Sequence, residues 1–97
     1  MAILDDVKVA LRIAATNTAF DGEVGDLIDA AKKDLELAGI TKADESDALI
    51  KRAINTYCKA HYGYDNPDAE RFLQSYLMLK MHLSLSVDYT EAAVVSP

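Results

Sequence analysis

The feature that most constrains the fold is a run of apolar residues at helical spacing that ends at a glycine. Six apolar side chains recur every three or four residues after Asp21, and so share one helix face: Val24, Leu27, Ile28, Ala31, Leu35 and Ala38. Gly39 follows at the position where a left-handed glycine commonly closes a helix. The pattern predicts an amphipathic helix that must bury this face against other elements.

Three further helices are predicted around this one. Residues 4–13 form a short helix with acids at its start, and a third helix runs from about Asp44 to Tyr62, where Gly63 ends it. Asn66-Pro67-Asp68 combines an N-cap residue, a proline for the first helical position and an acid for the first turn, so it starts a fourth helix. We expect an all-α fold, a small bundle of about four helices with an extended C-terminal tail. We expect its core to lie between the second, third and fourth helices and to include Leu27, Ile54 and Leu77.

The C-terminal region has two competing patterns. From Leu77 to Tyr89 apolar and polar residues alternate, which is typical of a half-buried strand, whereas leucine, methionine and lysine favour a helix. We expect helix to about Leu83, extended chain from Leu85, a domain over residues 1–89 and a flexible tail over 90–97. The apolar set also fits a helix contacted on two sides, and either arrangement implies a protein partner. The expected interface comprises Tyr76, Leu83, Leu85, Val87, Tyr89, Val94 and Val95.

Charge and composition narrow the class of protein. The net charge is −6, and residues 1–48 carry 11 acids against 5 bases, the opposite of the clustered cations that grip nucleic acid. A hydrophobic content of 51% provides for a core. The single cysteine cannot form an internal disulfide, and no stretch has the pattern of a signal peptide or a membrane span. We expect a soluble protein, made inside a cell, with no membrane contact.

Three local patterns resemble sites that carry chemistry, and each has a simpler structural interpretation. Cys58 and His61 lie one helical turn apart, but zinc needs more ligands than the sequence offers, and nothing orients a catalytic pair. Gly22-Glu23-Val24-Gly25 has GxxG spacing in acidic surroundings, which do not suit a nucleic-acid clamp. The acids of residues 44–47 suit a helix N-terminus better than a calcium loop. We expect no catalytic, cofactor-binding or metal-binding residue and no enzymatic activity.

The tyrosines leave one alternative open. Tyrosine is enriched at protein interfaces, because its ring is apolar and its hydroxyl is polar, but it also packs between helices. The five tyrosines lie mostly in the second half of the chain: Tyr57, Tyr62, Tyr64, Tyr76 and Tyr89. The sequence is compatible with tyrosines at a protein interface and with tyrosines packed between the third and fourth helices.

Three segments together have the pattern of a known family: residues 4–12, residues 49–57 with the turn Tyr62-Gly63, and residues 70–86. Over about residues 4–89 the chain resembles the tailed-phage head–tail connector proteins, also called adaptor, DNA-packaging or head-completion proteins. The resemblance implies a virion protein, assembled from the host cytoplasm, that forms a ring of commonly twelve copies under the portal. The ring would extend the DNA channel without binding DNA specifically. Its partners would be the portal protein, further copies of itself, and a downstream head-completion (stopper) or tail protein.

A second hypothesis is a small cytoplasmic helical regulator, or an antitoxin-like dimer, that acts by binding protein. The lack of a basic recognition helix counts against forms that bind DNA.

Overall fold

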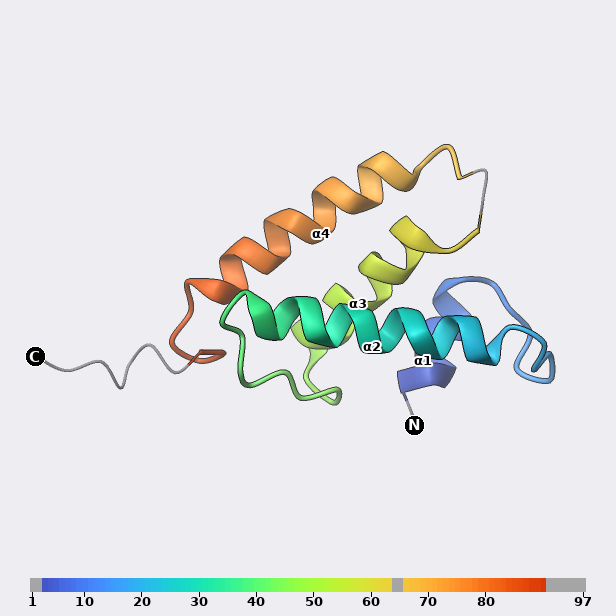
Figure 1. Ribbon diagram of the computed structural model, residues 1–97, viewed down its shortest axis with the longest axis horizontal. Coiled ribbons are helices and arrows are strands. Elements are labelled where there is room, and N and C mark those ends of the chain that lie inside the picture. Colours follow the sequence, from blue (N-terminus) through green and yellow to red (C-terminus); the bar gives the residue numbers. More distant parts are fainter. Residues whose placement is uncertain (1–2, 64–65, 91–97) are drawn as a thin grey trace, which may run out of the picture.

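The computed structural model describes residues 3–63 and 66–90 and contains four helices (Figure 1). They are α1 (Ile3–Ala10), α2 (Asp21–Leu37), α3 (Ala48–His61) and α4 (Ala69–Ser84). The described residues include no strand, so the all-α prediction is confirmed. None of these four helices has the length and apolar character needed to span a membrane.

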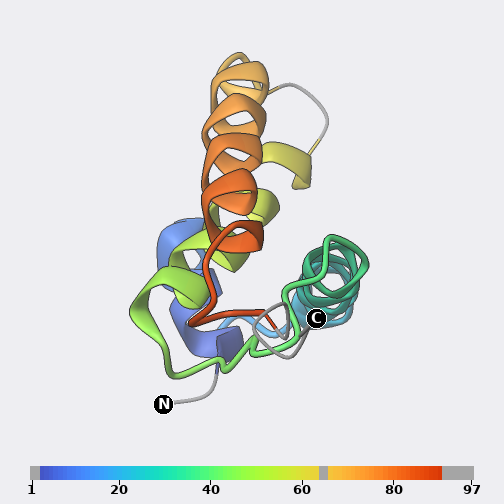
Figure 2. The ribbon, with the colours of Figure 1, turned by 90° about the vertical axis from the view of Figure 1, so that its left-hand side faces the viewer.

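Helix α3 is the centre of the arrangement, because it packs against each of the other three helices. Helix α4 crosses one side of it, while α1 and α2 pack on other sides (Figures 1 and 2). The largest fully buried side chains come from α1, α2, α3, α4 and the loop after α2: Val7, Val24, Leu35, Ile40, Ile50, Ile54, Cys58 and Tyr76.

The expected core is right for one residue and wrong for another. Ile54 is fully buried, and Leu27 is partly buried against the core. Leu77 is 41% exposed, because the face of α4 that meets the core runs through Tyr76 and Leu83. At about 100° per residue, Leu77 lies a quarter-turn away from Tyr76 and points outward.

The predicted end of α2 is confirmed in detail. Gly39 has a φ of +90°, and the Ile40 N–H donates to the Leu35 carbonyl over 3.0 Å. This i to i−5 bond is the hydrogen bond of a Schellman cap, and Ile40 then enters the core. Helix α1 ends in the same way, although Arg12 holds the left-handed position with a φ of +64° and Ile13 donates to Lys8.

The predicted start of α3 was wrong by one turn. The Asp44 carboxylate accepts from the backbone N–H of Ser46 over 2.9 Å and forms a local turn. Asp47 is the N-cap, because its carboxylate accepts from the N–H groups of Leu49 and Ile50. The acids of residues 44–47 therefore do act at a helix start, but Asp44 precedes the helix.

The start of α4 differs from the expectation for a related reason. The Asn66 side chain accepts from the Asp68 N–H over 3.0 Å and donates to the Lys59 carbonyl over 2.7 Å. Asn66 is thus the first residue of a turn tied to the end of α3, and the helix begins at Ala69. Short polar side chains compete with the helix for backbone hydrogen bonds, which moves both starts toward the C-terminus.

Lys8 anchors the connection between α1 and α2. Its side chain is buried, and Nζ donates to the carbonyls of Ala15 (3.2 Å) and Asn17 (2.8 Å). It also forms a 2.9 Å ion pair with Asp21 at the start of α2. A buried ammonium that satisfies two carbonyls and a carboxylate fixes this loop, and the sequence pattern did not reveal it.

The chain after α4 folds back onto the body. Residues 85–90 form turns, and the expected extended chain from Leu85 is not found there. The Lys42 N–H donates to the Tyr89 carbonyl over 3.2 Å, and the Tyr89 hydroxyl donates to the Asp47 carboxylate over 3.0 Å. Thr90 is buried, so the folded body extends through it. The rest of the expected tail, residues 91–97, lies outside the described residues.

Candidate functional site

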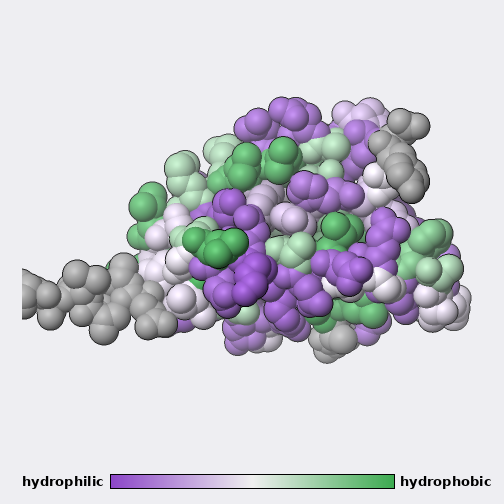
Figure 3. All heavy atoms as spheres, viewed as in Figure 1, coloured by the Kyte–Doolittle hydropathy of each residue, from purple (hydrophilic) through white to green (hydrophobic). Residues whose placement is uncertain are grey.

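Helix α4 has an apolar outer face in addition to its core face. Leu77, Met78, Met81 and Leu85 follow one another at spacings of one, three and four residues. They are 41%, 59%, 53% and 78% exposed, respectively. We call these four residues the α4 outer strip. Figure 3 shows hydrophobic surface over α4, and the strip confirms a helix whose apolar residues exceed one core-facing stripe.

The α4 outer strip has the properties of a contact surface. Large contiguous patches of exposed apolar side chains are rare on monomeric proteins, and where they occur they commonly mark a docking site. Its two methionines are flexible and polarisable, so they adapt to a facing surface. Val87, in the turn after α4, is exposed as well and extends the apolar surface beyond the helix.

The structure changes the expected interface set. Tyr76 and Leu83 are only 1% and 2% exposed, because they lie on the core face of α4, so neither presents a surface to a partner in this fold. Leu85 and Val87 are exposed. Tyr89 is half-buried and bonded to Asp47.

The last two members of the expected set, Val94 and Val95, lie outside the described residues. Sequence reasoning missed Met78 and Met81 as surface residues, although the i, i+4, i+8 spacing of Leu77, Met81 and Leu85 could have indicated a second face.

A partly buried polar cluster between α2 and α4 sets the rotation of α4. The Tyr76 hydroxyl donates to Asp34 of α2 over 2.5 Å, and Lys80 reaches the same carboxylate oxygen over 2.9 Å. Burial opposes ionisation of Asp34, but the bonds from Tyr76 and Lys80 outweigh it, so the pKa of Asp34 is lowered. Burial, together with the Asp34 bond, raises the pKa of Tyr76. Because these contacts fix one face of α4 inward, its outer strip faces away from the body.

The tyrosine alternative is decided for two residues. The rings of Tyr57 and Tyr76 meet edge to face with centroids 5.1 Å apart, between α3 and α4. The ring of Tyr62 meets Phe20 in a similar geometry at 6.2 Å. Tyr57 and Tyr76 therefore pack within the chain, as one of the two interpretations expected.

Cys58 and His61 have different surroundings. Cys58 is fully buried, and burial raises the pKa of its thiol to about 12, so the thiol stays protonated near neutral pH and is a poor nucleophile. His61 is exposed, and its ring lies tilted against that of Tyr57 with a centroid distance of 4.3 Å. Within residues 3–63 and 66–90, no three potential metal ligands of the His, Cys, Asp and Glu types gather.

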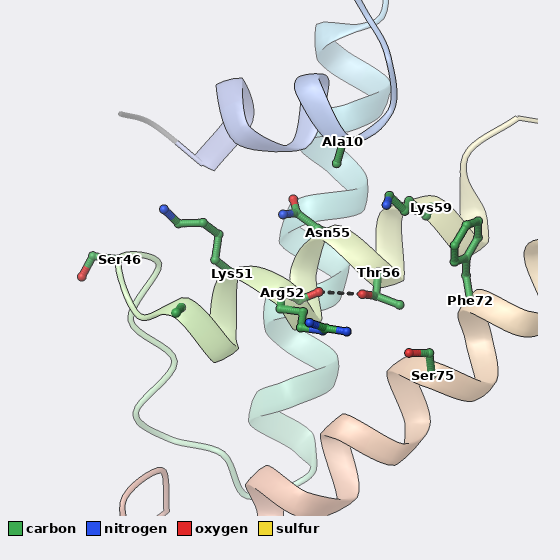
Figure 4. Close-up of a pocket in the computed structure, with 10 residues that line it drawn as sticks. Ala10, Ser46, Lys51, Arg52, Asn55, Thr56, Lys59, Phe72 and Ser75 are labelled. Atoms are coloured by element: carbon green, nitrogen blue, oxygen red, sulfur yellow. Dashed lines mark hydrogen bonds between the residues drawn. The ribbon is translucent and has the colours of Figure 1, made fainter.

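A groove of about 630 Å³ opens along α3, between the end of α1 and the start of α4 (Figure 4). We call it the α3 groove. Lys51, Arg52 and Lys59 line it together with Asn55, Phe72 and Ser75. Its lining includes no carboxylate, imidazole or thiol, so it offers no acid–base pair for catalysis. What it offers is a basic surface on an acidic protein.

The fold is thus a small helical bundle with an exposed apolar strip on α4 and a basic groove along α3. The sequence matches the phage connector protein family over residues 3–90, and the chain therefore belongs to that family. Comparisons with curated proteins and with solved structures gave no match. Membership confirms the resemblance and makes the chain a structural component of a phage virion that contacts other head or tail proteins. It favours the connector over the regulator or antitoxin-like hypothesis.

Proposed function

We propose that this chain is a head–tail connector (adaptor) subunit of a tailed bacteriophage. Copies of it form a ring, commonly of twelve, below the portal. The ring extends the DNA channel and provides the platform on which the next head-completion (stopper) or tail protein docks. Family membership supports the connector class, and the α4 outer strip is the observation that supports a docking role.

The strip is large enough to contribute to assembly. Full burial of one leucine or methionine side chain contributes roughly 1.5–3 kcal/mol, and the strip holds four such side chains, each between 41% and 78% exposed in the isolated chain. After the loss of side-chain freedom is subtracted, several kcal/mol remain for a contact with a partner. We assign this contact to the portal protein or to the downstream head-completion protein.

The C-terminal residues belong to the same proposed surface. Leu85 and Val87 follow α4 and are exposed, and the half-buried Tyr89 comes next in the chain. The proposed interface continues into residues 91–97, which include Val94 and Val95. An extended apolar segment can add a strand to a partner or fill a groove on it.

The charge of the protein suits passage of DNA. A net charge of −6 repels a duplex, so DNA moves through the ring without specific binding. The proposed place of action is the head–tail junction of the virion, reached from the host cytoplasm during assembly.

A pair of substitutions tests the docking role. Met81→Asp places a charge in the α4 outer strip, while Leu37→Asp makes the same kind of change at an apolar residue of α2 that is also exposed, 78% against 53% for Met81. Both proteins should fold, because both side chains point to solvent. We expect Met81→Asp to lose binding to the cognate portal or head-completion protein by at least about tenfold, which equals 1.4 kcal/mol.

Leu37→Asp should bind as wild type does. Co-sedimentation with portal assemblies and the yield of infectious particles measure the difference. Wild-type binding by Met81→Asp would remove the strip from the interface.

A further inference from the structure

The cations of the α3 groove are poorly matched within the chain. Arg52 and Lys59 form no ion pair with any carboxylate of residues 3–63 or 66–90, and Lys51 reaches only Asp6, over 3.4 Å. The ammonium of Lys59 instead lies 5.4 Å from the centre of the Phe72 ring. Three basic side chains along about two turns of one helix form a site that attracts an anionic partner.

Asn55 adds a second sign that the groove is incomplete in the single chain. Its side-chain carbonyl oxygen is buried and accepts no hydrogen bond from the described residues. The NH2 group of the same amide is a donor, from which an incoming carboxylate can accept a hydrogen bond.

The outer face of α2 has the complementary charge. Gly22, Gly25, Asp26 and Asp29 recur at i, i+3, i+4 and i+7, within an arc of about 100° on the side away from the core. Asp26 and Asp29 are exposed and form no ion pair among the described residues. We call these four residues the acidic face of α2.

The two glycines have no role in the packing of the single chain. A glycine in the interior of a helix, such as Gly25, costs about 1 kcal/mol relative to alanine, and a close neighbour usually explains it. A Cβ added at Gly22 or Gly25 would meet nothing within 4 Å, and both have ordinary helical φ values. Glycines that leave open space beside two carboxylates allow another backbone or side chain to approach this face closely.

These two surfaces lie on opposite sides of the molecule. Helix α2 turns its core face toward α3, which leaves its acidic face outward. Helix α3 turns the side chains of Ile50 and Ile54 to the core and its basic side chains into the groove. In Figure 4 the groove residues lie in front of α3 and α2 passes behind it.

We infer that the α3 groove of one copy receives the acidic face of α2 from a second copy. A basic surface on one side and an acidic surface on the other give a head-to-tail contact, which repeats from copy to copy and closes into a ring when the rotation allows. The inference rests on the proposed ring and names the surfaces that hold it together. Gly22 to Asp29 spans about 10 Å of helix, and Lys51 to Lys59 about 12 Å, so the two surfaces match in length.

A charge-exchange experiment tests this contact. The first variant, Arg52→Glu/Lys59→Glu, makes the groove acidic, and the second, Asp26→Lys/Asp29→Lys, makes the face of α2 basic. Each variant alone places like charges at every contact, so neither should self-associate. In an equimolar mixture in which the two variants alternate, each acidic groove meets a basic α2 face and each basic groove meets an acidic α2 face. The mixture should therefore associate as wild type does. Far-UV circular dichroism checks that each variant is folded, and sedimentation velocity up to about 1 mM detects even a weak contact.

The outcomes separate this inference from the proposed function. Association of either variant alone at the wild-type strength, failure of the folded mixture to associate, or a wild type that stays monomeric at about 1 mM would overturn the inference. A wild-type ring that both variants also form would leave the ring standing without this contact. Open chains of wild type, abolished in each variant and restored in the mixture, would support the contact and refute the closed ring.

Two further arms sharpen the result. Gly25→Ala should keep or raise the melting temperature and weaken self-association by about tenfold, because the added methyl group occupies the approach space. Unchanged association of this variant would contradict close approach at α2. Titration with duplex DNA tests whether the groove binds phosphates instead of carboxylates. If wild type does not self-associate but binds DNA, and Arg52→Glu/Lys59→Glu loses that binding, the groove is a phosphate site and the inference is overturned.

Discussion

Replacing Tyr76 with phenylalanine tests how α4 is held in place. The substitution keeps the buried ring and removes only the hydroxyl that donates to Asp34 over 2.5 Å. A hydrogen bond to a charged group contributes roughly 1.5–3 kcal/mol to stability. Asp34 keeps its bond to Lys80, and its side chain is 35% exposed, so solvent compensates part of the loss. We therefore expect Tyr76→Phe to lower the free energy of unfolding by about 1–2 kcal/mol at neutral pH.

The pH dependence gives this prediction a second test. The pKa of Asp34 is lower in the folded chain than in the unfolded one, so its bonds stabilise the fold above the unfolded pKa, near 3.9. That stabilisation is lost as the pH falls through the folded pKa. Urea unfolding curves of wild type and Tyr76→Phe should therefore converge in acid, with unchanged slopes.

Tyr57→Phe is the matched control, because the Tyr57 hydroxyl has no hydrogen-bond partner among the described residues, and it should change stability by less than about 0.5 kcal/mol. Equal stability of Tyr76→Phe and wild type at neutral pH, or a difference that persists below the folded pKa, would refute the reasoning.

Three further predictions concern stability and the C-terminus. Leu83→Ala should lower the free energy of unfolding by about 2–5 kcal/mol, whereas Met81→Ala on the exposed side of the same helix should change it by less than about 0.5 kcal/mol in denaturant melts. Arg12→Gly should raise stability by about 1 kcal/mol in thermal melts, because Arg12 holds a left-handed backbone conformation that glycine adopts without strain; a loss of stability would show that its side chain matters more. A protein that ends at Thr90 should unfold as the full chain does and yet join fewer heads to tails in a complementation assay, whereas full infectivity would exclude residues 91–97 from docking. One that ends at Asp88 should also lose stability, because it lacks the bonds of Tyr89 and the burial of Thr90.

Local signals in the sequence predicted the helices well and their starting points less well. The apolar period of α2 and the glycine that closes it depend on neighbours within four or five residues, so sequence pattern specifies them. Asp44 and Asn66 were expected to begin helices, but each forms a turn with a residue two positions along. The choice between a cap and a turn depends on tertiary contacts such as the bond from Asn66 to Lys59.

The surfaces could be predicted only in part, because they depend on packing between distant segments. The excess of apolar residues in α4 indicated a partner, but sequence could not tell which residues would face it. Tyr76 was assigned to the interface and lies in the core, because Asp34, more than 40 residues earlier, accepts its hydroxyl. The α3 groove forms where α1, α3 and α4 meet, and no single segment of the sequence carries its pattern.

Native mass spectrometry of the chain mixed with its cognate portal assembly tests the connector function most directly. The predicted result is one new complex, in which the portal assembly carries a full ring of copies of this chain, commonly twelve. When the chain is in excess, portal assemblies with fewer bound copies should not be present. The Met81→Asp protein should leave the portal bare under the same conditions. A portal that binds no copies of the wild-type chain, or only one or two, would contradict the assignment of this protein as the connector ring.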